Sequence, residues 1–383
     1  MTGAGSRPSG LERDERWARA AWSFLVEPQD PGLTRLIADR GAVEALALVR
    51  AGGEGARRGW GVRLPDLDLD HLAHVADHDG LEVVIPGDDG WPEVLNRLKH
   101  PPYCLYVRGE PDLAALMERS VAIVGARAAT EYGLRVAADL ADGLAGRGWT
   151  VVSGAAYGID AAAHRAALAA GGTTVAVLAC GANRIYPTPH RGLLDEIART
   201  AAVVSEVAPS FAPYRSRFLA RNRLIATLAR VTVVVEATLR SGSLTTARAA
   251  LEHHLPVGAV PGPVTSMASA GCHALLRETD AVLVTDAGEV AELGARIGED
   301  LLPAQRAAAA PRAPGDDLDP LGYAVWSAVP VRGGATTERL ASAAGVGTRQ
   351  LVGVLATMEA EGLVRREAGR WRKVTRPRGP RVG

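Results

Sequence analysis

Cysteine and aromatic residues are scarce in this sequence. Its three cysteines, Cys104, Cys180 and Cys272, are far apart and form no C-x-x-C pair. This spacing excludes a disulfide framework and a cysteine-based zinc site, and it favours a reducing cytoplasm. Aromatic residues make up only 4% of a chain that is 47% hydrophobic, so alanine, valine and leucine must supply most of the core. A chain of 383 residues predicts about two or three domains.

Long apolar runs and the common nucleotide-binding motifs are also missing. No segment approaches the roughly 18 apolar residues of a membrane span, and the polar, glycine-rich N-terminus does not resemble a signal peptide. No G-x-x-x-x-G-K-[ST] occurs, and no G-x-G-x-x-G follows the first strand of the expected parallel sheet. His253 and His254 lack a second ligand pair. We therefore expect a cytoplasmic protein with no membrane contact, cofactor or metal.

Acidic residues are absent from one stretch of the chain. Between Glu206 and Glu236 there is no Asp or Glu, although the formal net charge of the whole chain is zero. The same stretch carries five arginines: Arg215, Arg217, Arg221, Arg223 and Arg230. Arginine grips phosphate with two hydrogen bonds and stacks on bases, so this cluster indicates an anion site. The alternative is a helix face that is simply solvated.

Residues 81–300 predict an α/β domain. Apolar strands are expected at 81–85 and 103–107, and then at 121–124, 150–152, 173–178, 201–204, 231–235, 257–260 and 281–284. Helix formers fill the segments between the later strands, notably 131–145, 160–170 and 244–253. Near-continuous apolar strands that alternate with helices predict a parallel sheet covered on both faces.

Different patterns flank this domain. Residues 1–80 predict a disordered start, to about residue 14, and then a small helical, SAM-like module with helices at 18–26, 33–49 and 67–78. Residues 301–320 are rich in Ala, Pro and Asp and predict a linker. Residues 321–375 predict a helix, a turn, a second helix and a β-wing in a basic setting. Residues 376–383 predict a disordered basic tail.

Small residues follow four of the expected strands. These loops contain Gly125, then Ser153 and Gly154, then Ser241, Gly242 and Ser243, and finally Gly262. Ligands of parallel sheets bind beyond the carboxyl ends of the strands, at the switch in strand order. Glycine lets a ligand approach the backbone, and the helix N-termini that follow favour phosphate. The alternative is that these glycines only make the turns.

Several motifs, in this order, resemble those of the DNA-processing protein A family (DprA, or Smf). They are Val121-Ala-Ile-Val-Gly-Ala-Arg127 with Tyr132-Gly133, Ser153-Gly-Ala-Ala-Tyr-Gly-Ile-Asp160 with His164, Cys180-Gly-Ala-Asn-Arg-Ile-Tyr-Pro187, Ser205-Glu206, Phe218-Leu-Ala-Arg-Asn-Arg223, Ser241-Gly-Ser-Leu-Thr-Thr-Ala247 and Pro261-Gly262. The similarity spans at least residues 81–284 and, more loosely, both ends. It implies an extended Rossmann-like fold, a C-terminal winged helix, and a homodimer that binds single-stranded DNA and hands it to RecA recombinase during natural transformation.

The residues suggest how a single strand would be bound. Phosphate groups would contact Arg127, Arg215, Arg217, Arg221 and Arg223, and Phe218 would be a stacking platform. Arg223 and Arg230 are the weaker candidates, because some of these side chains must face away or pair with Glu206 or Glu236. Asn222 either joins the site or ties the loop backbone to the sheet. The expected site is completed by Gly125, Ser153, Gly154, Ser241, Gly242, Ser243 and Gly262.

The sequence also departs from the family pattern. Ser is expected at Ala126, Pro at Leu219, Asn at His273 and a basic residue at Leu255, and Thr279-Asp280 stands where Gly-Ala is usual. We expect Ala126 and Leu255 at or near the pocket, where they would weaken its hydrogen bonds and its charge. None of the changes removes an arginine.

No catalytic group is expected. Asp160 and His164 lie four residues apart on one helix, which favours a carboxylate at a helix N-terminus and a neighbouring histidine over an acid–base pair. Ser153 has neither a G-x-S-x-G elbow nor an evident base. Tyr186 and Trp149 are expected to be packing residues.

We predict a non-catalytic protein that binds single-stranded DNA, protects it and loads RecA. The winged helix would contact duplex DNA, through Thr348-Arg349-Gln350, or another protein. One alternative is a Rossmann-type enzyme that cleaves nucleoside monophosphates, but Pro261-Gly262-Pro263 breaks the Pro-Gly-Gly-x-Gly-Thr loop of such enzymes and removes a phosphate-binding N–H. The other is a RecA partner with little affinity for DNA.

Overall fold

The computed structural model describes residues 10–53, 59–296, 318–331 and 333–374. The chain divides into two compact units, Met1–Leu302 and Pro303–Gly383. Most of the expected disordered start, most of the linker over 301–320 and the tail over 376–383 lie outside the described residues. The expectation of disorder up to about residue 14 is wrong for Gly10–Arg13, which form the 3-10 helix η1.

The described part of the first unit is built on a nine-stranded sheet in the order β1-β2-β6-β5-β4-β3-β7-β8-β9. The strands are β1 (Leu81–Val84), β2 (Leu105–Gly109), β3 (Ser120–Val124), β4 (Thr150–Ser153), β5 (Thr174–Val177), β6 (Ala202–Ser205), β7 (Val231–Val234), β8 (Val257–Ala259) and β9 (Val282–Leu283). The pairs β1–β2 and β2–β6 are antiparallel, and every other pair is parallel. The predicted parallel sheet is confirmed, with an antiparallel edge.

The strand order reverses beside β3. Strands β4, β5 and β6 follow it on one side, while β7, β8 and β9 lie on the other. Val124 of β3 pairs with Val234 of β7, so the two strands end level with each other. In doubly wound sheets of this Rossmann-like kind, the loops after two such strands diverge and leave a crevice between them.

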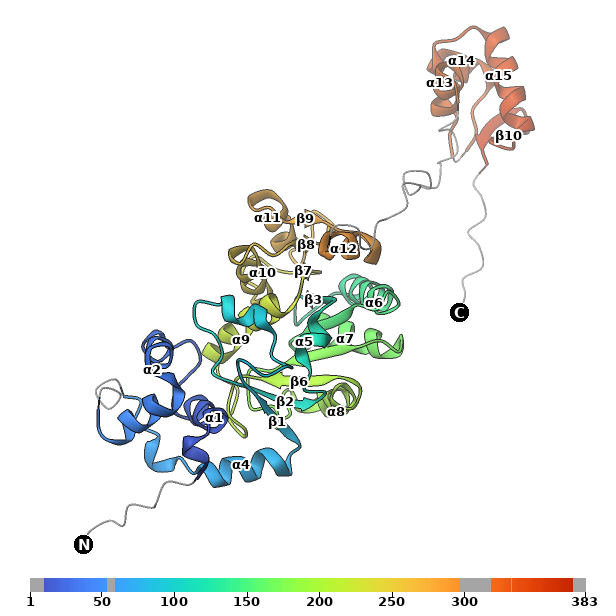
Figure 1. Ribbon diagram of the computed structural model, residues 1–383. Helices are drawn as coiled ribbons and strands as arrows, with labels where there is room; N and C mark the ends of the chain where they lie inside the picture. The colour runs from blue at the N-terminus through green and yellow to red at the C-terminus, as the bar shows by residue number, and fades with distance from the viewer. Residues whose placement is uncertain (1–9, 54–58, 297–317, 332, 375–383) are drawn as a thin grey trace. The chain divides into compact units, whose positions relative to one another are not determined.

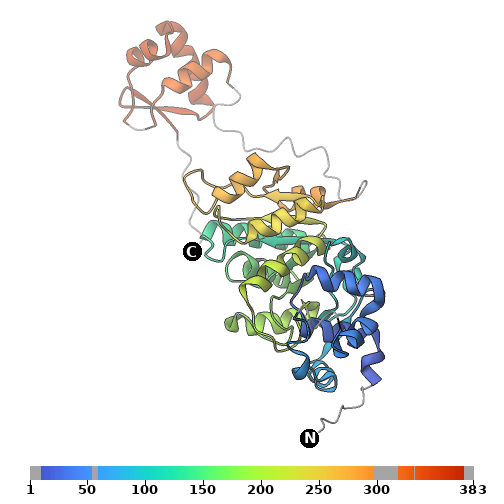
Figure 2. The same cartoon turned by 90° about the vertical axis from the view of Figure 1, so that its left-hand side faces the viewer.

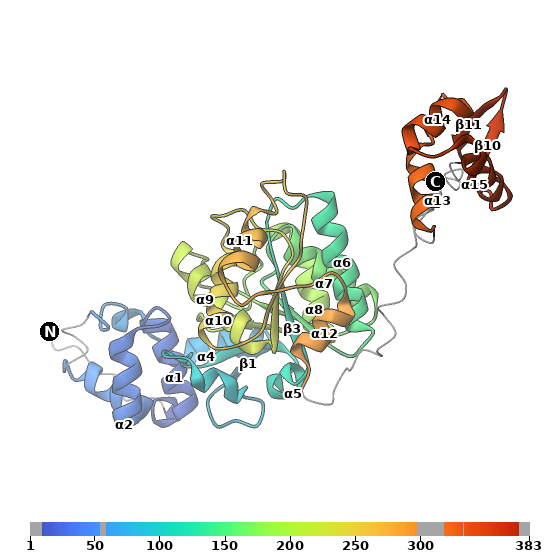
Figure 3. The same cartoon turned by 90° about the horizontal axis from the view of Figure 1, so that it is seen from above.

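Alternate side chains of β3 enter two different cores. Val121 and Ile123 pack with α6, α7 and α12, whereas Ala122 and Val124 share a core with α9, α10 and α11. Figures 1 and 3 show these two groups of helices on opposite faces of the sheet. The bounds are η3 (Glu93–Arg97), α5 (Leu113–Met117), α6 (Glu131–Ala145), α7 (Ile159–Ala169), η4 (Thr188–His190), α8 (Arg191–Thr200), α9 (Arg215–Leu228), α10 (Ser243–Glu252), α11 (Ala270–Glu278) and α12 (Ala287–Gly294). With both faces covered, a ligand must approach at the strand ends.

The N-terminal helices α1 (Glu15–Leu25), α2 (Pro31–Arg50) and α4 (Leu69–His78), with the 3-10 helix η2 (Leu64–Asp66), pack beside β1 and β2 (Figure 2). Gly41 interrupts α2 with a φ of 78°, a conformation that glycine adopts without strain. The helices share one core with Cys104 and Tyr106, and the Tyr106 hydroxyl lies 2.9 Å from Ser23 Oγ. The predicted domain boundary near residue 80 therefore cuts through a core that the N-terminal helices share with the sheet.

The described residues of the second unit form three helices and a β-hairpin: α13 (Pro320–Ala328), α14 (Thr337–Ala344), α15 (Thr348–Ala360), β10 (Val364–Glu367) and β11 (Arg370–Lys373). Gly345 ends α14 in the left-handed conformation, with a φ of 66°. Sequence analysis did not predict α13, although the Asp319 carboxylate caps it and Pro320 occupies its first turn. No helix among the described residues is long and apolar enough to span a membrane.

Candidate nucleic-acid interface

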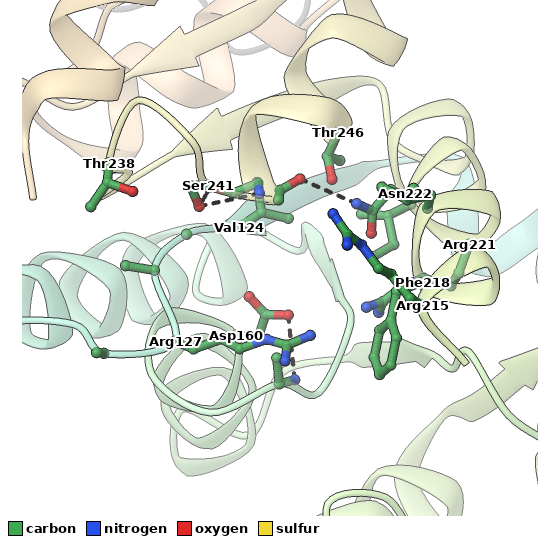
Figure 4. A pocket seen from close by; sticks show the side chains of 18 residues that line it. Val124, Arg127, Asp160, Arg215, Phe218, Arg221, Asn222, Thr238, Ser241 and Thr246 are labelled. Atoms are coloured by element: carbon green, nitrogen blue, oxygen red, sulfur yellow. Dashed lines mark hydrogen bonds between the residues drawn. The ribbon is translucent and has the colours of Figure 1, made fainter. Parts of the chain in front are cut away.

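A cavity of ≈ 610 Å³ opens at the reversal, where β3 and β7 end. Its walls are the loop after β3, the loop after β4 with Ala156 and Asp160, the loop after β7 with the start of α10, and one face of α9 (Figure 4). Nine of the residues expected at the site line it, namely Gly125, Arg127, Arg215, Phe218, Arg221, Asn222, Ser241, Gly242 and Ser243. Ala128, Thr238 and Thr246 also line it and were not predicted, because their positions depend on which strands are neighbours.

Helix α9 supplies the cationic and aromatic wall. Arg215, Phe218, Arg221 and Asn222 recur at helical spacing and all line the cavity. Arg215 is exposed and Phe218 is half-buried, while Arg221 is only 5% exposed. On the facing wall, Arg127 places its guanidinium 5.0 Å from the centre of the Phe218 ring (Figure 4). Three guanidinium groups and one aromatic ring thus border a single cavity.

Arg221 is buried at the base of this wall. Its Nη1 donates a hydrogen bond of 2.7 Å to the carbonyl of Val177. A Cβ on Gly154 would overlap its guanidinium, so any larger residue at that position would displace the arginine. Burial lowers the pKa of Arg221 to about 10, although the negative charge of Asp160 acts in the opposite direction. Arg221 therefore remains a cation at neutral pH.

Asp160 balances this buried charge and orders the loop after β4. Its carboxylate accepts hydrogen bonds from the N–H groups of Gly154, at 3.2 Å, and Ala156, at 3.4 Å. Burial raises its pKa, although the charge of Arg221 opposes the rise. His164 instead lies 2.6 Å from Thr174 Oγ1 and is fully buried, which lowers its pKa to about 3. Asp160 and His164 therefore have separate hydrogen-bond partners. This agrees with the prediction that they are structural residues and not an acid–base pair.

Arg217 and Arg223 do not line the cavity, so the structure does not support their expected role in binding phosphate. Arg217 is 3% exposed and binds Glu27 of the N-terminal module through Nε and Nη2, at 2.8 and 2.7 Å. Arg223 pairs with buried Glu206. Inward pairing with Glu206 was the alternative considered for Arg223, and it is the one observed. Both arginines stabilise the protein itself.

Three further residues of the expected site serve the protein's packing. The Ser153 hydroxyl is fully buried and donates to the Ile123 carbonyl at 2.6 Å. Gly154 makes room for Arg221, and Gly262 makes room for Ser269. The expectation that all four glycine loops border one pocket is therefore wrong for the loop at Gly262. The loop after β4 does border the cavity, through Ala156 and Asp160, although Gly154 itself does not line it.

Asn222 lines the cavity and also has a structural role. Its side-chain amide donates to the Gly242 carbonyl at 3.2 Å and to Thr245 Oγ1 at 2.7 Å. It therefore joins α9 to the start of α10.

Glu236, which follows β7, is buried. Its carboxylate accepts hydrogen bonds from the N–H and the hydroxyl of Thr130, at 2.9 and 2.6 Å, and these bonds fix the start of α6.

The departures from the family pattern fall in different places. Ala126 lines the cavity, as expected, and so does Leu219. Leu255 precedes β8 and lies at the opposite, amino end of the strands, so its expected effect on the pocket is wrong. His273 Nε2 lies 3.1 Å from the Gly262 carbonyl, outside the cavity. Thr279 accepts a hydrogen bond from Ala281 and ends α11.

Residues 82–294 match the family model of DNA recombination-mediator protein A. The chain belongs to this family. A DprA relative from Mycobacterium tuberculosis is 44% identical over 372 residues, which cover 92% of this chain and 93% of the relative. The X-ray structure of DprA from Streptococcus pneumoniae is 31% identical, has a TM-score of 0.61, and covers 74% of this chain and 98% of its own. DprA from Helicobacter pylori, whose structure was described for its single-stranded DNA binding mode, is 31% identical, with a TM-score of 0.50 and coverage of 56% and 96%.

Membership of the DNA recombination-mediator family confirms the resemblance seen in the sequence motifs. It places the chain in DNA processing and recombination and agrees with the Rossmann-like sheet. The roles of individual side chains at the cavity remain predictions.

Proposed function

We propose that this protein binds single-stranded DNA without chemical catalysis, protects it and loads RecA recombinase onto it. The observation that carries the proposal is the cavity at the β3–β7 reversal, which Arg127, Arg215 and Arg221 line together with the Phe218 ring. A single strand offers phosphates to guanidinium groups and unpaired base faces to an aromatic ring. The Helicobacter pylori relative is described as binding this same ligand, single-stranded DNA.

The charges around the cavity favour an extended polyanion. Arg127 and Arg215 are exposed, so their guanidinium groups can reach phosphates, whereas Arg221 contributes a fixed positive charge from below. No acidic residue other than Asp160 is found among the described residues that line the cavity, and Asp160 faces Arg221. Binding through phosphates and base faces is insensitive to sequence and sensitive to salt.

The direct test is a filter-binding titration of oligo-dT with a double variant, Arg127→Ala plus Arg215→Ala. Both side chains are exposed, so the variant should fold. We expect micromolar or tighter binding by the wild type and a loss of about tenfold or more in the variant. Arg199→Ala is the matched control, since Arg199 is an exposed arginine of α8 outside the cavity. Unchanged affinity in the double variant would overturn the site.

The rival function is cleavage of nucleoside monophosphates. An enzyme of that kind needs a phosphate loop beside its catalytic acid, but the space beside Gly262 of Pro261-Gly262-Pro263 is filled by Ser269, and this loop lies outside the cavity. Incubation with AMP followed by chromatography for adenine tests this alternative. We expect no release above the rate without protein, and release at steady turnover would favour the enzyme.

We also propose that the protein acts as a homodimer. Strand β9 lies at the edge of the sheet, and both of its residues, Val282 and Leu283, are exposed. An exposed apolar edge strand is suited to pairing with a second copy. In sedimentation velocity we expect a dimer for the wild type and a monomer for Leu283→Lys.

For the second unit we propose a winged helix in which β10 and β11 form the wing. The N-terminus of α15, with Thr348, Arg349 and Gln350, is exposed and would enter the major groove of duplex DNA. Arg349→Ala should then weaken duplex binding and leave oligo-dT binding unchanged. If duplex affinity does not change, contact with a protein partner becomes the better interpretation.

A further inference from the structure

Exposed tyrosines are concentrated at one edge of the sheet. The chain has only seven tyrosines. Four of them follow the carboxyl ends of β3, β4, β5 and β6 in turn: Tyr132, Tyr157, Tyr186 and Tyr214. Because these strands are parallel, the four loops share the edge on which the cavity opens. By contrast, Tyr103 and Tyr106 are buried.

Two of these tyrosines have clear structural roles. Tyr132 donates its hydroxyl to the Pro261 carbonyl at 2.6 Å, and Tyr214 covers the guanidinium of Arg217 at 5.0 Å. Tyr186 is different. The residue is 41% exposed, and the centre of its ring lies 5.8 Å from that of Phe218, at an interplanar angle of 59°. Tyr186 packs against Phe218, as expected, but it also leaves a large part of its surface open to solvent.

The loop that carries Tyr186 is also free of acids. Between Asp160 and Asp195 the sequence contains no Asp or Glu, and on either side of Tyr186 it contains Arg184 and Arg191. Both arginines are exposed. The carboxylate of Asp79, from the end of α4, approaches this loop but accepts a hydrogen bond of 2.6 Å from Asn183. This acid-free segment continues the positive character of α9 along the edge formed by β4 and β5.

We propose that Tyr186 is a second base-stacking residue and that the strand leaves the cavity past Phe218 toward the loops after β5 and β4. The proposal rests on the proposed binding of single-stranded DNA. The separation of the Phe218 and Tyr186 rings, 5.8 Å, exceeds the roughly 3.4 Å rise per nucleotide of a stacked strand, so it suits consecutive bases of an extended one. Tyr157, 47% exposed and seated against His190 at 4.9 Å, lies in the loop after β4 on the same edge.

Affinity measurements with matched variants test this path. Fluorescence anisotropy with oligo-dT should show about tenfold weaker binding for Tyr186→Ala and nearly unchanged binding for Tyr186→Phe, because a phenyl ring still stacks. Tyr323→Ala, which removes an exposed tyrosine from the second unit, should have no effect. The same ratio of wild-type affinity to Tyr186→Ala affinity with oligo-rU would show that Tyr186 contacts the base and not the sugar.

Photocrosslinking separates contact from an indirect effect on Phe218. Oligo-dT that contains 5-iododeoxyuridine crosslinks to aromatic side chains stacked on that base, so in the wild type we expect adducts at both Phe218 and Tyr186. Adducts at Phe218 alone, together with unchanged affinity in Tyr186→Ala, would overturn the inference and leave the proposed function intact. Failure of the wild type to bind oligo-dT at all would overturn both.

Discussion

The guanidinium group of Arg221 occupies the space that a side chain at residue 154 would need. The two residues belong to different parts of the fold: Gly154 follows β4, and Arg221 lies in the middle of α9. The space beside a glycine that sequence analysis assigned to a ligand is therefore filled by one of the protein's own arginines. The arrangement fixes a buried cation at the base of the candidate DNA site.

Gly154→Ala tests this relationship. The added methyl group would displace Arg221, and overpacking of this kind costs about 1–3 kcal/mol of unfolding free energy. Affinity for oligo-dT should fall as well, because the buried cation moves. Urea denaturation and anisotropy measure the two effects. Gly192→Ala is the control, since a Cβ there meets no atom within 4 Å and Gly192 lies in α8, outside the cavity. Equal stability of the two variants would contradict the packing described.

Glu27→Gln tests the reassignment of Arg217. This change removes the charged partner of a buried arginine, but the Glu27 side chain is 45% exposed and solvent screens the pair. We expect a loss of about 1 kcal/mol in unfolding free energy, with oligo-dT affinity within about twofold of the wild type. If Arg217 instead bound phosphate, its release from Glu27 would strengthen DNA binding.

Salt dependence distinguishes the arginines. Each phosphate neutralised in a single strand contributes about 0.7 to the slope of log K against log salt. Arg127→Ala and Arg215→Ala should each reduce the slope by about that amount. Arg223→Ala should leave the slope unchanged but destabilise the protein by about 3–5 kcal/mol, because it strands the buried carboxylate of Glu206. A lower slope of log K against log salt in Arg223→Ala would show that Arg223 binds phosphate after all.

His164 should make stability depend on pH. Burial holds its pKa at about 3 in the folded protein, against about 6.5 when unfolded. Between these values the unfolded chain binds a proton that the folded chain does not, so stability is lost as pH falls below about 6.5, by up to about 1.4 kcal/mol per pH unit. The raised pKa values of Asp160 and Glu206 act on wild type and variants alike. The difference in unfolding free energy between wild type and His164→Asn should therefore change from pH 7 to 5 and stay flat above 7.

Much of the fold could be predicted from periodicity. The apolar strands and α6 were placed closely, because strands buried on both faces have near-continuous apolar sequences. Helix α13 was not predicted, because the Asp and Pro that mark its start fall in a segment whose composition is that of a linker. The candidate site was predicted as a set of loops and arginines, but not as a geometry. Inward-facing Arg217 and outward-facing Arg215 are two residues apart, and only the position of Glu27 explains the difference.

A crystal structure of the protein with a short oligo-dT tests the central claim most directly. We predict phosphates within hydrogen-bonding distance of Arg127 and Arg215, a base against Phe218, and the strand continuing over Tyr186. A strand bound elsewhere on the protein, with the cavity at the ends of β3 and β7 empty, would contradict the claim.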